Sequence, residues 1–222
     1  MERPDFSVDD EGYWEKKYKQ LLSDIKQEFP NFAIIPKKTS KFSQMLGRLT
    51  FWNKDFNRTY STTIGPKIYT SEVWKDHPAM NRFATMVHER IHMRQTQKYG
   101  FLAFFAVFGL IPLPAKIAYF RRKWEWEAYK VGICVRFLKG GREAVLDPKF
   151  IKYLLDQFCG AFYLWTWHSR KAIIKDLLRV LHALERNTLT WEKIIHQRRL
   201  PWGVKPLKAP LLLRLLYPAE MQ

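Results

Sequence analysis

The spacing of apolar residues predicts a chain that begins with a helix and continues into short strands. Residues 11–28 place five apolar side chains near one helical face, and Pro30 follows the expected helix end. These apolar residues are Tyr13, Tyr18, Leu21, Leu22 and Ile25. Residues 32–69 change to short β-branched and aromatic runs separated by turn-forming residues, so this part predicts a small sheet.

The chain after this sheet has helical patterning. Residues 80–99 have the apolar spacing of a helix that ends at Gly100, and a second helix should close at Gly140 and Gly141. We therefore expect an α+β fold, in which a small sheet in the N-terminal half precedes a helical C-terminal half. The expected domain covers residues 1–187, and residues 188–222 form a basic tail punctuated by tryptophan and proline.

An apolar segment at residues 101–118 invites comparison with a membrane span. Its uninterrupted apolar run is shorter than the 18 or more residues that usually cross a bilayer, and it is broken by Gly109, Pro112 and Pro114. We expect a hairpin within the domain that is buried or that touches a membrane interface, without crossing the bilayer.

The charge of the chain is unevenly distributed. The net charge is +17, and because residues 1–30 carry a net of −3, the other 192 residues carry +20. Such a basic body favours contact with nucleic acid or with an anionic membrane surface. Two cysteines, Cys134 and Cys159, are too few for a disulfide framework or a four-cysteine metal site. The N-terminus lacks the apolar core of a secretory signal, so we expect a cytoplasmic protein, with peripheral membrane attachment as an alternative.

The strongest chemical motif is HERIH, residues 88–92, on the helix predicted to end at Gly100. Residues four apart share a helical face, so His88 and His92 can bind one metal ion while Glu89 reaches a water on it. A catalytic zinc site needs a third protein ligand and an open fourth position.

Two glutamates on the next helix are candidates for the third ligand. Glu125 and Glu127 are about 200° apart around a helix, so only one of them can face the metal. Glu125 shares its face with the small residues Ala128 and Gly132, which would permit close approach of the HERIH helix. We therefore expect Glu125 to be the ligand, with solvated carboxylates balancing nearby bases as the simpler interpretation.

These residues carry a family resemblance. HERIH followed by a second helix with Glu-x-x-Ala resembles the gluzincin class of zincin metallopeptidases. HExxH-x-x-Q, ending at Gln95, and the later ExEAY segment are similar to compact HExxH proteins of bacteria and their phages. The resemblance covers about residues 59–132. It departs from the gluzincin pattern at Tyr129, where an acid would orient a ligand histidine.

The resemblance implies a Zn²⁺ cofactor, a peptide or protein substrate, and hydrolysis by a metal-activated water. The implied metal ligands are His88, His92 and Glu125, and Glu89 is the implied catalytic base. A donor to the oxyanion is also needed, and the candidates are His168, Tyr163 and Tyr129. In zincins an edge strand before the HExxH helix pairs with extended substrate, and the candidate strand here contains Lys67, Ile68, Tyr69 and Thr70.

A second class of function is also compatible with the sequence. On a degenerate zincin scaffold, the basic body would make a non-enzymatic protein that binds nucleic acid or a membrane surface. Zinc content together with the activity of a Glu89→Gln variant separates the two classes, because binding alone would survive that change.

Overall fold

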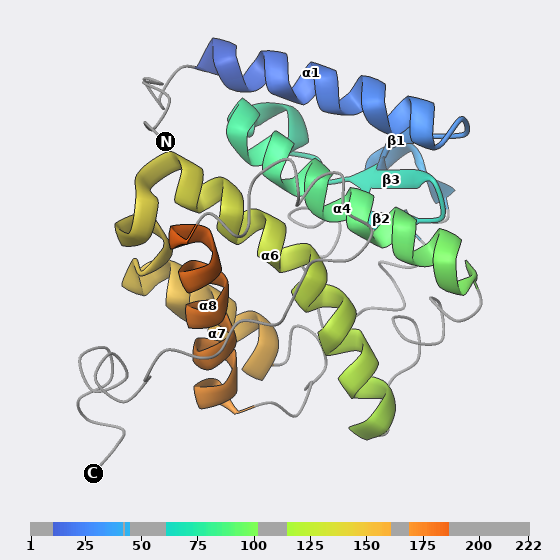
Figure 1. The fold of residues 1–222 in the computed structure, drawn as a ribbon. Coiled ribbons are helices and arrows are strands. Elements are labelled where there is room, and N and C mark those ends of the chain that lie inside the picture. Colours follow the sequence, from blue (N-terminus) through green and yellow to red (C-terminus); the bar gives the residue numbers. More distant parts are fainter. Residues whose placement is uncertain (1–10, 42, 45–60, 102–114, 161–168, 187–222) are drawn as a thin grey trace. The chain divides into compact units, whose positions relative to one another are not determined.

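The computed structural model describes residues 11–41, 43–44, 61–101, 115–160 and 169–186. Within these ranges the protein is mixed α+β, with five α-helices and a three-stranded sheet (Figure 1). The expected tail at 188–222 and most of the expected hairpin at 101–118 lie outside the described residues. The chain divides into two compact units, Met1–Phe104 and Phe105–Gln222, whose boundary falls within that apolar segment.

In the first unit, helix α1 (Glu11–Glu28) packs along helix α4 (Ala79–Tyr99), as Figure 1 shows. The buried face of α1 carries Trp14, Tyr18, Leu21 and Ile25, much as its apolar spacing predicts. The carboxylate of Glu11 accepts a hydrogen bond of 2.6 Å from the backbone N–H of Ala79, and this contact caps the first turn of α4.

The other end of α1 is tied to α4 by a cluster of charges. Glu28 lies 2.7 Å from Arg90 and 2.6 Å from Arg94. Burial acts to raise the pKa of Glu28, but hydrogen bonds and charge from the two arginines outweigh it and lower the pKa below its ordinary value. Arg90 lies within HERIH and Arg94 lies two residues after it, and both are paired with Glu28 of α1. Helix α1 therefore holds the helix that carries the motif.

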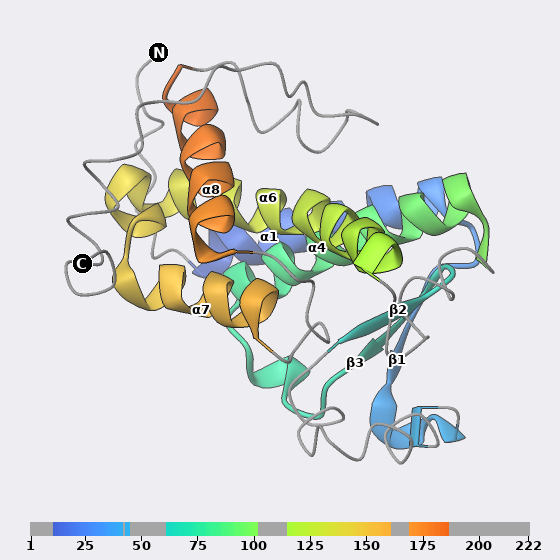
Figure 2. The same ribbon diagram turned by 90° about the horizontal axis from the view of Figure 1, so that it is seen from below.

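The sheet contains β1 (Ala33–Pro36), β2 (Thr62–Ile64) and β3 (Lys67–Thr70) in the order β1-β3-β2 (Figure 2). Strands β2 and β3 form an antiparallel hairpin, and Gly65 in their turn has a φ of 57° that favours glycine. Strand β3 also pairs in parallel with β1.

This topology corrects one prediction. Lys67, Ile68, Tyr69 and Thr70 were expected to form an edge strand that pairs with substrate, but they form β3, the central strand. The backbone groups on both sides of β3 already pair with β1 and β2, so β3 has no open edge for a substrate. Among the described strands, β2 and β1 are the outer ones, and β2 packs against α4.

Short 3₁₀ turns, η1 (Lys37–Thr39) and η2 (Trp74–Asp76), follow β1 and β3. Helix α4 ends where the sequence predicts, because Gly100 has a φ of 85° and its N–H bonds to the carbonyl of Thr96. The buried residues Phe83, Met86 and Val87 give α4 its apolar contact.

The described part of the second unit contains three helices, α6 (Ala115–Val145), α7 (Pro148–Cys159) and α8 (Arg170–Glu185). Helix α6 has non-helical backbone at Gly140 and Gly141, the pair predicted to close it, and continues for one more short segment. Asp147 caps α7 through the N–H of Lys149, and Ser169 caps α8 through the N–H of Ala172. The core of this unit contains Val131, Ile133, Val135, Ile151, Leu154, Phe158, Ile173, Leu177 and Leu181.

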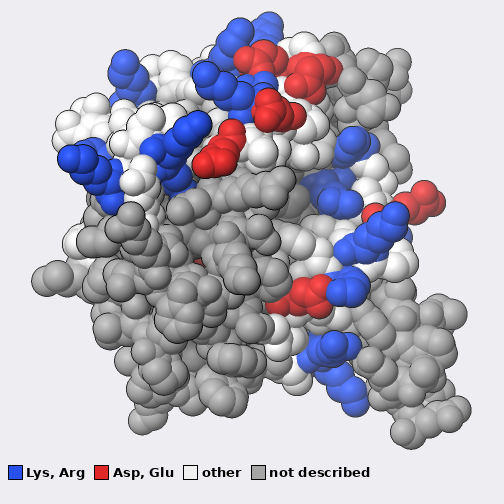
Figure 3. Space-filling view, turned by 180° about the vertical axis from the view of Figure 1, so that it is seen from behind, with Lys and Arg blue, Asp and Glu red and all other residues white. Residues whose placement is uncertain are grey.

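None of the described helices has an apolar stretch long enough to span a bilayer. On the face drawn in Figure 3, basic and acidic side chains lie next to one another. Several surface bases pair with acids, as in Lys152 with Asp156 and Arg142 with Glu185. Contact of the basic body with nucleic acid or with a membrane surface stays a prediction.

Candidate metal centre

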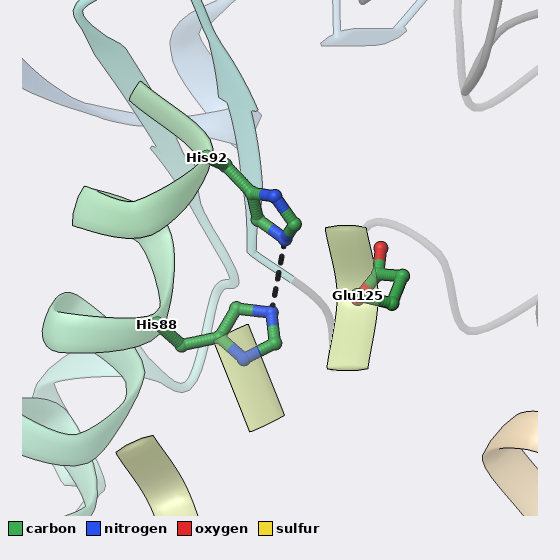
Figure 4. Close-up of side chains that lie close together, drawn as sticks. All are labelled: His88, His92 and Glu125. Atoms are coloured by element: carbon green, nitrogen blue, oxygen red, sulfur yellow. Dashed lines mark hydrogen bonds between the residues drawn. The ribbon is translucent and has the colours of Figure 1, made fainter. Parts of the chain in front are cut away.

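The two histidines of HERIH converge on α4. Their Nε2 atoms lie 3.1 Å apart, and their rings face one another edge to face (Figure 4). Two nitrogens that bind one tetrahedral Zn²⁺ at 2.0–2.1 Å would be about 3.3 Å apart. The pair of His88 and His92 therefore has the spacing of two ligands of one metal ion, and the residue types suit Zn²⁺.

The outward-facing nitrogen of His92 is held by a neighbour. Its Nδ1 lies 2.9 Å from Oε1 of Gln95, and both side chains are buried. The amide oxygen only accepts, so the proton sits on Nδ1 and leaves the lone pair of Nε2 for a metal. Gln95 thus orients His92, a candidate metal ligand, and its position three residues after His92 was the signal in the sequence.

Glu89 is buried beside the histidine pair and is held from the sheet. The hydroxyl of Thr63 on β2 donates a hydrogen bond of 2.5 Å to Oε2 of Glu89, and the two residues are 26 positions apart in the chain. Glu89 is 6% exposed and Thr63 is 7% exposed. A buried carboxylate needs such partners, because burial without them is costly.

A buried amine also interacts electrostatically with Glu89. Lys37, the first residue of η1, is only 2% exposed. Burial lowers the pKa of Lys37 to about 7, while the negative charge of Glu89 acts in the opposite direction. Neither Thr63 nor Lys37 was identified in the sequence, because neither belongs to a motif and both reach Glu89 through long-range folding.

Glu125 and Glu127 occupy different surroundings on α6. Glu125 is 4% exposed, whereas Glu127 is half-buried. Arg121, one turn earlier, faces Glu125: burial lowers the pKa of this guanidinium to about 10, and Glu125 opposes that shift. Glu127 instead faces Lys130. Figure 4 draws Glu125 from α6 together with the two histidines from α4.

Of the three candidates for the oxyanion donor, the structure describes Tyr129. His168 and Tyr163 lie outside the described residues. The hydroxyl of Tyr129 lies 3.3 Å from that of Tyr153 on α7. Burial raises the pKa of Tyr153, and the negative charge of Glu125 also raises it, so Tyr153 is a second phenol near Glu125 that the sequence did not indicate.

The isolated thiols play no part in this centre. Cys134 is buried, and burial raises the pKa of its thiol well above the ordinary value, with Lys130 acting in the opposite direction. Cys159 is partly exposed, and its thiol pKa is also raised by burial.

Comparison of the chain with protein-family models, with curated proteins and with solved structures gave no match. The functional conclusion therefore depends on the residues of the centre and their chemistry.

Proposed function

We propose that the protein is a zinc metallopeptidase that hydrolyses peptide bonds on a zincin-like fold. The observation that carries the proposal is the 3.1 Å separation of the two Nε2 atoms of HERIH, with Gln95 fixing the tautomer of His92. Histidines that bind a metal usually donate their other ring N–H to an acceptor, and Gln95 supplies that acceptor to His92.

Glu125 is the proposed third ligand. Its burial and the facing guanidinium of Arg121 favour a fixed carboxylate, and the half-buried Glu127 lacks this setting. Among the described residues, His88, His92 and Glu125 are the set of histidine, cysteine and acidic side chains that could hold a metal ion. This donor set is that of catalytic zinc sites with two histidines and one glutamate.

Each group has a role in the proposed reaction. When bound, Zn²⁺ lowers the pKa of a water ligand and polarises a substrate carbonyl. Glu89 accepts a proton from the attacking water and returns it to the leaving amine, which balances the proton over the cycle. Tyr129 is a candidate hydrogen-bond donor to the oxyanion that develops on the carbonyl.

The test combines metal analysis with peptide hydrolysis. The purified protein should carry about one zinc per chain, and His92→Ala should lose it. Glu89→Gln should retain zinc and lose turnover by about 10²- to 10⁴-fold on a fluorogenic peptide library, because it removes the base and keeps the ligands.

Full zinc occupancy in His92→Ala would contradict the ligand assignment. Equal activity of Glu89→Gln and the unchanged protein would contradict the mechanism. If both proteins bind zinc and neither cleaves any peptide, the non-enzymatic binding function is favoured.

A further inference from the structure

Glu89 lies on α4, but the groups that hold its carboxylate come from two other segments of the first unit. Thr63 reaches it from β2 with the 2.5 Å hydrogen bond, and Lys37 faces it from the turn after β1. All three side chains are less than a tenth exposed. The cluster therefore joins one residue of the HERIH motif to the sheet, through side chains with no part in the motif.

Threonine suits a strand, but the hydroxyl of Thr63 is buried and therefore needs a hydrogen-bond partner. Thr63 pairs with Ile68 in the centre of the hairpin, where an apolar β-branched side chain would satisfy the sheet equally well. The hydrogen bond to Glu89 offsets the cost of burying the hydroxyl, since a buried hydroxyl without a partner is destabilising. The bond also fixes which oxygen of Glu89 is occupied, Oε2.

From this arrangement we infer that Thr63 is a positioning residue for Glu89: its hydroxyl fixes the orientation of the carboxylate that accepts the proton from water. The inference about proton transfer rests on the proposed function. The placement of the carboxylate by Thr63 does not depend on it.

A positioned base affects turnover more than it affects substrate binding. A carboxylate that turns out of its hydrogen-bonded orientation accepts and returns protons less efficiently. The metal ligands and the substrate contacts are unchanged by that rotation. Removing the Thr63 hydroxyl should therefore lower kcat and leave zinc content and KM nearly unchanged.

The decisive variant is Thr63→Val, which has the same shape as threonine and suits a strand. It should retain one zinc per chain, lower kcat by about 10-fold or more and change KM by less than about 3-fold. Thr63→Ser restores the hydroxyl and should recover kcat to within about 3-fold of the unchanged protein. Thr62→Val makes the same substitution at the preceding residue of β2, whose side chain points to the opposite face of the sheet, and should leave kcat unchanged.

A folded, zinc-loaded Thr63→Val protein with unchanged kcat would overturn the inference, as would Thr63→Ser that is no better than Thr63→Val. If Thr63→Val does not fold, Thr63→Ala takes its place in the same comparison with Thr63→Ser.

A thermal double-mutant cycle of Thr63→Val and Glu89→Ala separates this inference from the proposed function. If the two side chains are paired, Thr63→Val should lower Tm in the unchanged protein and have little effect once Glu89 is alanine. Additive Tm losses would overturn the placement of Glu89 by Thr63. Absence of peptide hydrolysis in the unchanged protein, with non-additive Tm losses, would remove the proposed function and retain this placement.

Discussion

Each of the two units buries a lysine, but the partners of the two lysines come from different places. Lys37 in the first unit follows β1, and the acid that faces it, Glu89, is on α4. Lys130 in the second unit lies on α6. The acid with the largest effect on it, Glu127, is three residues away on the same helix, and Asp176 of α8 has a smaller effect. Burial lowers the pKa of both lysines to about 7.

The difference indicates which buried charges belong to a site. Neighbours on one helix meet whenever the helix forms, so the contact of Glu127 with Lys130 needs no further purpose. Lys37, Thr63 and Glu89 meet only after three separate segments have folded together, and each of them is removed from water. Such a cluster is costly to bury and gives the fold nothing that apolar residues could not supply, which favours a chemical role.

Glu125 is the strongest test of the distinction between contacts within one helix and contacts between distant segments. It lies on α6 near Glu127 and Lys130, and it is nevertheless the proposed third metal ligand. Glu125→Ala should lower zinc affinity by about 100-fold or more, since it removes one of three protein ligands. Glu127→Ala is the matched control and should change zinc affinity by less than about 3-fold. Competition with a zinc-sensitive chelating dye measures both, and the reverse order would transfer the ligand role to Glu127.

The next largest effect is expected at Gln95. Gln95→Ala frees the Nδ1 of His92 from its acceptor and should lower zinc affinity by about 10- to 100-fold. Gln97→Ala removes an exposed glutamine two residues later on α4 and should have no measurable effect. Equal zinc affinities of the two variants in the same dye competition would show that Gln95 does not orient His92.

Glu28 tests whether charges contributed by different helices matter more than those within one helix. Glu28→Gln leaves Arg90 and Arg94 without their carboxylate and should lower the free energy of unfolding by about 1.5 kcal/mol. Asp24→Asn changes an acid of α1 that is bonded by Gln20 of the same helix, so its effect should be about 0.5 kcal/mol or less. Urea unfolding at pH 7 compares them.

The pH dependence of Glu28 has a definite sign. Its pKa is lowered in the folded protein, so its contribution is present above the pKa of the unfolded chain and is lost as the pH falls through the lower folded value. The difference between Glu28→Gln and the unchanged protein should therefore shrink in acid. A difference that is constant from pH 7 to pH 3 would contradict the pairing.

Lys130 should give an effect of another kind, a change in the slope of stability against pH. Because burial lowers its pKa to about 7, the unfolded chain holds a proton between pH 7 and 10.5 that the folded protein does not, and the free energy of unfolding rises with pH. The contribution is at most about 1.4 kcal/mol per pH unit. Lys130→Met should remove it, as measured by urea unfolding at pH 7, 8 and 9. An identical slope in Lys130→Met would mean that this lysine stays protonated.

Much of the fold follows from local pattern. The bounds of α1 and the C-terminus of α4 agree with the apolar spacing and with Gly100, because both depend on residues within a turn of one another. His88 and His92 could be paired from their spacing alone, since four residues on a helix bring two side chains to one face.

Contacts between segments that are distant in the chain could not be predicted from the sequence. The strand at Lys67 was expected at an edge because nothing in its own pattern shows that β1 lies parallel to it on the second side. Likewise Thr63 reads as an ordinary strand residue and Lys37 as a surface base. Their burial beside Glu89 depends on how β1, β2 and α4 meet, and apolar periodicity carries no information about that.

The contacts of α1 have a consequence for how the protein can be cut. Glu11 and Glu28, at the two ends of α1, reach the first turn of α4 and the arginines around HERIH. Proteolytic removal of the first 28 residues would expose the apolar face of α4 and release the arginines beside the histidine pair. A recombinant fragment that keeps both sets of contacts must therefore begin at or before Glu11.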